Sequence, residues 1–534
     1  MNRISDISQV RRIRDVENWT MRAIWAEGFF LALFPSIAAF AIMAGIILWF
    51  LRLQVDKNFK LRSLPYDLPT ILFFVISAAS VIFSPVKSFE LFYNFFSLAG
   101  IYILTYVLVG QNIRTPEQIK FLIKGIGASA VFVVFCGFFQ YIFGVDIADM
   151  KWIDGEAFPE LRKRVFSTLE NPNILAGYLD VMICIALGLL AKFGDKKQKI
   201  LLAVAILLMT ACLAMTYSRG AFLTLAIIFV IYGVIQDWRI LIIFTLLIGI
   251  IIFSDTTFSN RIISIFTDTL DSSEGLRIGI WVSTIPMIAD HPFAGVGWGA
   301  YQFIYPQYNY YLADTSITIY HAHNLYLNTA AEVGIVGAMA YFWYFFGTMF
   351  MALDLRSNRR YALITSTAEF ISLKIWEMLC KFFNEHFGQS KLLQKIFAVK
   401  INLKRKLNAF TNKFLENFDS ESEKSPQKNE KRDPNLVHHD ELKFSSRKKK
   451  NKSDDDDDKF DIQKFAESPK EITKLNNKNF IEGIRFGIGL AFLSMAINGF
   501  ADDLLFNVQS SILMWQLGAL AAACQLVLRK EDKE

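Results

Sequence analysis

Two histidines and an asparagine begin the segment "HAHNLYLNTAAEVGIVG" (321–337), which leads into an apolar stretch of membrane length. If a helix starts at His323, the positive end of its dipole disfavours the imidazolium form, and a neutral imidazole can act as a general base on a hydroxyl group. Gly334 and Gly337 would then lie below His323 on one face, where another helix can approach closely. His321 cannot share that face and is expected to point elsewhere. A capping histidine without a chemical role is the alternative.

Three separate segments carry arginines that could bind an anion. Arg219 lies in "MTYSRGAF" between two apolar stretches, Arg277 lies in "SSEGLRIGIW" and is expected to precede an amphipathic helix, and Arg164 follows Arg162 and Lys163 in "LRKRVFSTLENPN". Guanidinium groups bind phosphate oxygens in a planar, bidentate way that lysine does not reproduce. The three segments therefore indicate an anionic ligand, although an arginine at a membrane surface can also anchor the chain to lipid headgroups.

Two further patterns are weaker signals of chemistry. The glycine-rich "GVGWGA" (295–300) has neither the preceding strand nor the lysine-serine pair of a nucleotide-binding loop, so we predict a turn. Asp502 and Asp503 are an adjacent acidic pair, for which helix capping or pairing with an arginine is the expected role. The early loops offer no paired carboxylates suited to a divalent metal, and we predict neither a metal site nor a cofactor.

The elements that position these residues are expected to be membrane helices. The chain has 534 residues, is 53% hydrophobic and contains 50 Phe, and its apolar residues gather in runs close to the length that crosses a bilayer. The block at 25–53 predicts a hairpin broken at Pro35, with a single tilted crossing as the alternative. We expect an all-α integral membrane protein of about 11–12 transmembrane helices without a cleavable signal. Its other runs are 67–84, 89–110, 118–144, 174–193, 199–217, 221–236, 239–254, 325–353, 480–500 and 507–528.

The distribution of basic residues predicts the side on which each loop lies. Lysine and arginine are in excess at 52–62, 114–124 and 192–199, which marks these loops as cytoplasmic and places both chain ends inside. All the candidate residues then gather on the outer face. The outer loops are 145–173, 216–221, 254–322 and 498–503.

The expected domain organisation has three parts. Residues 1–354 form a transmembrane domain that includes the large extracytoplasmic loop 254–322. Residues 355–478 form a charged, partly disordered cytoplasmic insert, which either docks an assembly partner or acts as a tether. Residues 479–534 hold the last two transmembrane helices and the C-terminal tail.

The pattern from His323 and Asn324 through Gly334 to Gly337 is histidine, asparagine, nine residues, glycine, two residues, glycine. It resembles the signature of the O-antigen ligase and polymerase superfamily, integral-membrane glycosyltransferases that act on undecaprenyl-diphosphate-linked glycans. The supporting segments are "FSTLENPNILAGYL" (166–179), "TYSRGAFLTL" (216–225), "LRIGIWVSTIPMIADHPFAGVGWGAYQF" (276–303) and "DDLLFNVQSSILMWQLGAL" (502–520).

The resemblance implies a role for each candidate residue. Arg219 and Arg277 would bind the lipid diphosphate, and His323 would deprotonate the acceptor hydroxyl, which attacks the anomeric carbon with inversion. No metal or nucleotide cofactor is implied, because the diphosphate is itself an activated leaving group. Arg164 is expected to add to the diphosphate or glycan site, Asn324 to orient the histidine or a sugar, and Tyr217 or Tyr301 to contact sugar or lipid. Gly334 and Gly337 would be structural.

The resemblance also implies partners and a location. We expect a bacterial cytoplasmic (inner) membrane protein with its active site facing outward, a lipid-linked glycan donor, a lipid, polysaccharide or protein acceptor, and no nucleic acid partner. An O-antigen ligase is favoured. The alternatives are a polymerase or protein O-oligosaccharyltransferase of the same superfamily, a transporter of lipid-linked glycans, and a non-catalytic assembly subunit.

Overall fold

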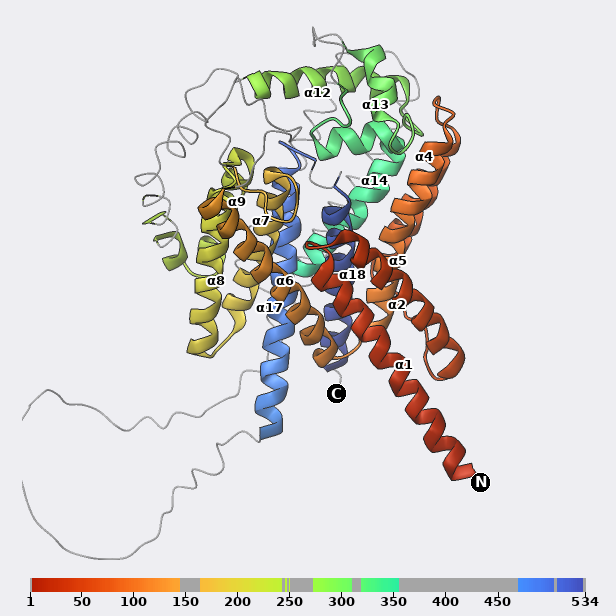
Figure 1. Ribbon diagram of the computed structural model, residues 1–534, viewed down its shortest axis with the longest axis vertical. Coiled ribbons are helices and arrows are strands. Elements are labelled where there is room, and N and C mark those ends of the chain that lie inside the picture. Colours follow the sequence, from red (N-terminus) through yellow and green to blue (C-terminus); the bar gives the residue numbers. More distant parts are fainter. Residues whose placement is uncertain are drawn as a thin grey trace, which may run out of the picture. The chain divides into compact units, whose positions relative to one another are not determined.

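The computed structural model describes residues 2–144, 164–242, 245–246, 249, 272–309, 318–354, 469–503 and 507–531 (Figure 1). Within these ranges every regular element is helical. The first two helices are α1 (Asn2–Phe30) and α2 (Pro35–Val55). They are followed by α3 (Asp67–Ile82), α4 (Phe89–Asn94), the π-helical turn η1 (Phe95–Ala99), α5 (Gly100–Asn112), α6 (Pro116–Phe143), α7 (Pro172–Lys192), α8 (Lys196–Ala214), α9 (Arg219–Ile235), α12 (Ser272–Asp290), α13 (Tyr301–Ile304), the 3-10 helix η3 (Tyr305–Tyr308), α14 (Leu325–Leu353), α17 (Pro469–Asn498) and α18 (Val508–Glu531).

Eight helical stretches among the described residues are long and apolar enough to cross a membrane. They are α2, the continuous run of α4, η1 and α5, then α6, α7, α8, α14, α17 and α18. The helices α3 and α9 are also apolar but shorter, with 16 and 17 residues. The predicted all-α membrane architecture is confirmed, and the chain is a multi-pass membrane protein. The count of about 12 crossings stays a prediction.

The chain turns where the sequence predicts the first hairpin. α1 ends at Phe30, and α2 begins with Pro35 at its first position, where the missing N–H of proline has no helical partner to lose. The two helices pack against each other. Only α2 is among the candidate spans, because the first half of α1 is rich in charged residues such as Arg11 and Arg14.

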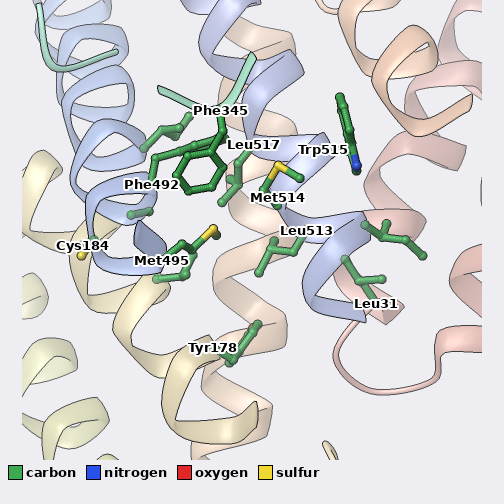
Figure 2. Packing of buried hydrophobic residues seen from close by; sticks show 14 of the residues in the cluster. Leu31, Tyr178, Cys184, Phe345, Phe492, Met495, Leu513, Met514, Trp515 and Leu517 are labelled. Atoms are coloured by element: carbon green, nitrogen blue, oxygen red, sulfur yellow. The ribbon is translucent and has the colours of Figure 1, made fainter. Parts of the chain in front are cut away.

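The best-packed pair of helices is α7 and α17, which lie side by side in Figure 1. Small residues allow this contact, because a Cβ atom added at Gly188 of α7 would meet the backbone of Gly483 and Gly487 in α17. Figure 2 shows that the core continues into α14 and α18. Phe345 of α14 packs on Phe492 of α17, with their ring centroids 5.1 Å apart. This packing holds the end of α17 beside the start of α14.

Two predicted segments fall wholly or largely outside the described residues. The expected span at 239–254 is described only at 239–242 and three further positions. The expected insert at 355–478 is described only from Pro469, where α17 begins, so the last ten residues assigned to the insert are helical.

The most consequential departure from regular helix is a break inside α14 at Gly334, which has φ 72° and ψ 172°. The loop after α12 fills the break: the N–H groups of Val296 and Gly297 donate to the carbonyls of Ala331 and Glu332 at 2.8 and 2.9 Å. The "GVGWGA" segment is thus a turn, as predicted, and it supplies hydrogen bonds that the broken helix cannot make by itself.

The two motif glycines therefore serve different contacts. The prediction that Gly334 lies on a helical face open to another helix is wrong, because its partner is the backbone of Phe293 in the loop. At Gly337 the prediction of a close helix approach is correct, since an added Cβ would lie 3.1 Å from Ile76 of α3.

We predict that Gly334→Ala destabilises the protein by about 1–3 kcal/mol or more, because alanine resists the positive φ and its Cβ would collide with the backbone oxygen of Phe293. The measurement is the melting temperature in detergent. Gly127→Ala in α6 is the matched control, since an added Cβ there has no neighbour within 4 Å, and it should leave the melting temperature unchanged or raise it slightly. Equal melting temperatures for the two variants would contradict the role given to the break.

Candidate active site

The candidate site is centred on Asp502, in the loop between α17 and α18. Its Oδ1 lies 3.2 Å from Nδ1 of His323, and its Oδ2 lies 3.6 Å from Nη2 of Arg277. The Nδ2 group of Asn173, in the first turn of α7, donates to the same Oδ2 at 3.5 Å. One carboxylate therefore joins groups from α7, α12 and the segment before α14.

The surroundings of Asp502 keep it ionised. Burial alone would raise the pKa of this carboxyl, but the hydrogen bond with His323 and the positive charge of Arg277 act in the opposite direction and hold the pKa below its ordinary value. A carboxylate in this position can fix the orientation of an imidazole ring and a guanidinium group at the same time.

His323 is not part of a helix, contrary to the prediction. α14 begins at Leu325, and Asn324 is its N-cap, whose Oδ1 accepts from the backbone N–H groups of Tyr326 and Leu327 at 3.0 Å. Asparagine is a strong N-cap former, so the helix begins only after the histidine. His323 itself has φ 47° and presents Nδ1 to Asp502.

His321 lies against His323 rather than pointing elsewhere, so this prediction is also wrong. The two ring centroids are 4.1 Å apart, and Nδ1 of His321 accepts the backbone N–H of His323 at 3.2 Å. Burial and the neighbouring His323 and Arg277 lower the pKa of His321 to about 3. His321 is therefore neutral near pH 7, with its proton on Nε2.

Arg277 lies in the second turn of α12, whereas the sequence placed it before the helix. Gly275 does not stop the helix, because a single glycine costs only about 1 kcal/mol and α12 packs on α14. The Nη1 group donates to the carbonyl of Ala501 at 2.6 Å, and Nη2 pairs with Asp502. The guanidinium is therefore held by two groups of the 501–502 turn and is about 30% exposed.

Arg164 reaches the same carboxylate through one intermediate residue. Its Nε donates to the carbonyl of Thr216 at 2.7 Å, and its Nη2 donates to Oδ1 of Asn173, which in turn contacts Asp502. Arg162 and Lys163, the other members of this basic group, lie outside the described residues.

Arg219 is the first residue of α9, and the first turn of this helix approaches the same turn. A Cβ added at Gly220 would lie 3.7 Å from Cβ of Ala501, so the N-terminus of α9 adjoins the 501–502 turn. The preceding Tyr217 is buried and has φ 51°. The structure thus brings the three predicted arginines to the neighbourhood of one loop.

Two other predicted residues are engaged within the protein. Asn324 caps α14 and donates through Nδ2 to the carbonyl of Phe500 at 3.0 Å. Tyr301 is fully buried, with its hydroxyl 2.7 Å from that of Thr284. Contacts of Asn324 with a substrate stay a prediction, whereas Tyr301 packs between α12 and η3 without lining a cavity that the structure describes.

The backbone around this site is strained. Four of the five described non-glycine residues with positive φ, Ser167, Glu170, Tyr217 and His323, lie in the three segments that surround the 501–502 turn, and the fifth, Asp354, caps the end of α14. Such conformations cost about 1–3 kcal/mol each in non-glycine residues and concentrate at functional sites. The strain independently marks the region that the histidine and the arginines indicate.

Asp502 and Asn173 are members of the candidate site that sequence reasoning did not assign to it. Pairing of Asp502 with an arginine was expected and is confirmed, but its contact with His323 was not foreseen. The available signal was an acidic pair in a loop predicted to lie on the same side as three basic segments. Nothing in the sequence showed which of Asp502 and Asp503 would meet the histidine.

Fold and site together define a multi-pass membrane protein with a carboxylate-bound histidine and three nearby arginines, suited to holding an anionic group and moving a proton. Residues 204–342 match the family model described as O-antigen ligase. This match includes Arg219, Arg277 and His323, and it confirms the resemblance to the O-antigen ligase and polymerase superfamily. The family supports a membrane glycosyltransferase-like enzyme. No curated protein matches the chain at a significant level.

Proposed function

We propose that the protein is an O-antigen ligase-type glycosyltransferase, which moves a glycan from an undecaprenyl-diphosphate carrier to an acceptor hydroxyl at the outer face of the bacterial cytoplasmic membrane. The observation that carries the proposal is the binding of both His323 and Arg277 by Asp502. A base and an anion-binding group that are held by one carboxylate can act in the same displacement reaction, the base on the acceptor hydroxyl and the guanidinium on the leaving diphosphate.

His323 acts as the general base in this proposal. When Nδ1 carries the proton that it shares with Asp502, Nε2 is the unprotonated nitrogen and can accept the proton of the acceptor hydroxyl. No described residue bonds to Nε2, and the side chain is about one third exposed. Asp502 is a positioning residue that selects this tautomer.

The arginines stabilise the leaving group. The acceptor oxygen forms a bond to the anomeric carbon as the bond from that carbon to the diphosphate oxygen breaks, and the electron pair leaves on the lipid diphosphate. Arg219 and Arg277, with Arg164 behind them, face this growing negative charge and supply the stabilisation. Attack from the side opposite the leaving group inverts the anomeric centre.

We predict that Arg277→Lys weakens donor binding about tenfold, because one ammonium group cannot bond to Ala501, Asp502 and a diphosphate as a planar guanidinium can. The measurement is the Kd of a fluorescent lipid-diphosphate-linked oligosaccharide for the full-length protein. Arg239→Lys, at an exposed arginine after α9, is the matched control and should bind the donor like the wild type. Unchanged donor affinity in Arg277→Lys would remove this residue from the diphosphate site.

The function itself is tested in membranes that contain the protein, the lipid-linked donor and the native acceptor pool. Release of lipid diphosphate and the carrier of the product are measured. Glycan on a new carrier supports a ligase, and a ladder still on lipid diphosphate means a polymerase of the same superfamily. If the glycan crosses the bilayer without release of the lipid diphosphate, the protein is a transporter rather than an enzyme.

A further inference from the structure

A cavity of about 300 Å³ lies beside the segment that holds His323. Its walls come from α3, the α4 to α5 run, the turn after α12, the first turns of α14, and α18. The volume is at the lower end of ligand-binding pockets, which corresponds to one ring rather than a chain of sugars.

The cavity begins within a few residues of the proposed base. Tyr320 and Leu325, which flank the histidine segment, both line it, and so does Asp503, the neighbour of Asp502. The lining residue Asn328 also accepts the backbone N–H of Ala322 at 3.1 Å and so ties the cavity wall to the histidine segment. A ligand in the cavity would therefore lie close to His323.

The lining combines aromatic rings with buried acidic and amide groups. Trp298, Tyr341 and Trp515 supply flat apolar surfaces, to which Asn94 and Gln302 add amides. This mixture suits a sugar, whose C–H faces pack on aromatic rings and whose hydroxyl groups need polar partners.

Glu332 is the observation that points to a ligand. It is only 8% exposed, it lines the cavity, and its Oε1 has no hydrogen-bond partner among the described residues. The backbone groups of Gly299 and Tyr301 also interact with this carboxyl. A buried carboxyl oxygen without a partner is costly unless a ligand supplies a donor, and a sugar hydroxyl would do so.

The charge of the cavity differs from that of the neighbouring site. Glu332 and Asp503 both line it, and the described lining residues include no lysine, arginine or histidine. Arg164, Arg219 and Arg277 instead surround the 501–502 turn. An anionic group would therefore find no cation to pair with in the cavity, whereas the arginines around the turn can bind it.

We propose that this cavity binds the sugar ring of the acceptor that receives the glycan, and that it selects a ring without phosphate or carboxylate groups. The inference rests on the proposed function and adds the substrate class of the acceptor side. An acyl chain is disfavoured as the occupant, because it would leave Glu332 without a hydrogen-bond donor.

The test uses the full-length protein in membranes, a fluorescent lipid-diphosphate-linked donor and the native acceptor pool, with soluble methyl glycosides as competitors for the acceptor. Methyl glucoside and methyl glucosaminide should inhibit transfer to the native acceptor, and methyl glucuronide should not. In Glu332→Gln the concentration of methyl glucoside for half inhibition should rise about tenfold, and the glucuronide should still be excluded, because neither lining offers it a cation. The donor Kd should not change.

Two variants make the test specific. Glu90→Gln, at an exposed glutamate of α4 outside the cavity, is the matched control and should behave like the wild type. Gln302→Met removes a lining amide without changing the charge, and it should weaken inhibition by the glucoside while retaining discrimination against the glucuronide. It also provides a second measurement if Glu332→Gln does not fold.

The outcomes separate the two proposals. Three outcomes would overturn the cavity assignment while His323-dependent transfer still stands. They are equal inhibition by all three glycosides, no inhibition by any of them, and glucoside inhibition that is unchanged in both Glu332→Gln and Gln302→Met. Absence of transfer from the wild type, with donor and acceptor present, would remove the proposed function and the cavity assignment together.

Discussion

Replacing His323 by alanine is expected to lower the rate of glycan transfer by about 10²–10⁴-fold, because the acceptor hydroxyl loses its base. Donor binding should persist, since the arginines that face the diphosphate remain in place. The measurement is the rate of lipid diphosphate release in membranes with matched protein levels, together with the donor Kd. A large fall in rate at constant donor affinity assigns His323 to the chemical step.

His291→Ala is the control for this experiment. His291 follows the last turn of α12, and the hydrogen bonds described for it are made by its backbone, to Met287 and Gly295. Its replacement should change the transfer rate by less than about twofold. If His323→Ala releases lipid diphosphate as fast as the wild type, general-base catalysis by this histidine is wrong.

Asp502→Asn is expected to lower the rate of transfer by about 10²-fold with a near-normal fold, because an amide neither selects the tautomer of His323 nor neutralises Arg277. The measurement is the transfer rate, with the donor Kd determined in parallel. Asp290→Asn is the control. Asp290 is not part of the 501–502 turn, and its carboxylate accepts a hydrogen bond of 2.7 Å from the hydroxyl of Tyr308. A rate for Asp502→Asn equal to that of Asp290→Asn would show that the carboxylate is not needed.

The pH dependence of stability gives a second readout for Asp502→Asn. The pKa of Asp502 is held below its ordinary value in the folded protein, so the ion pair contributes its full stability above the pKa of the unfolded chain and loses it as the pH falls through the lowered pKa. The difference in melting temperature between wild type and variant should be constant above about pH 5 and shrink below it.

Much of the helical architecture could be predicted from the sequence. The expected apolar runs at 118–144, 174–193 and 325–353 agree with α6, α7 and α14 to within a few residues, and the hairpin turns at Pro35. Hydropathy predicts such elements well because, in a bilayer, backbone groups must be satisfied within the helix itself. Sequence reasoning also selected the three arginines and His323, because polar and charged residues are rare within the apolar runs and stand out at their ends.

The geometry around His323 was not predictable from helical spacing. The projection from His323 to Gly334 assumed one continuous helix, but Asn324 starts the helix after the histidine and Gly334 interrupts it. The cap sets the start of the helix after the histidine. The break is stabilised by hydrogen bonds from Val296 and Gly297, which belong to a loop distant in sequence. Spacing rules include neither effect.

The sequence by itself determined the class of protein, its membrane helices and the residue types that can bind a diphosphate and accept a proton, because these depend on local composition. The tertiary structure decided which groups meet: it places Asp502 between His323 and Arg277, and it sets the buried Glu332 in a cavity beside them. These contacts join residues far apart in the chain, so they arise only when α14, α17 and α18 pack together and bring residues 501–503 against the segment before α14.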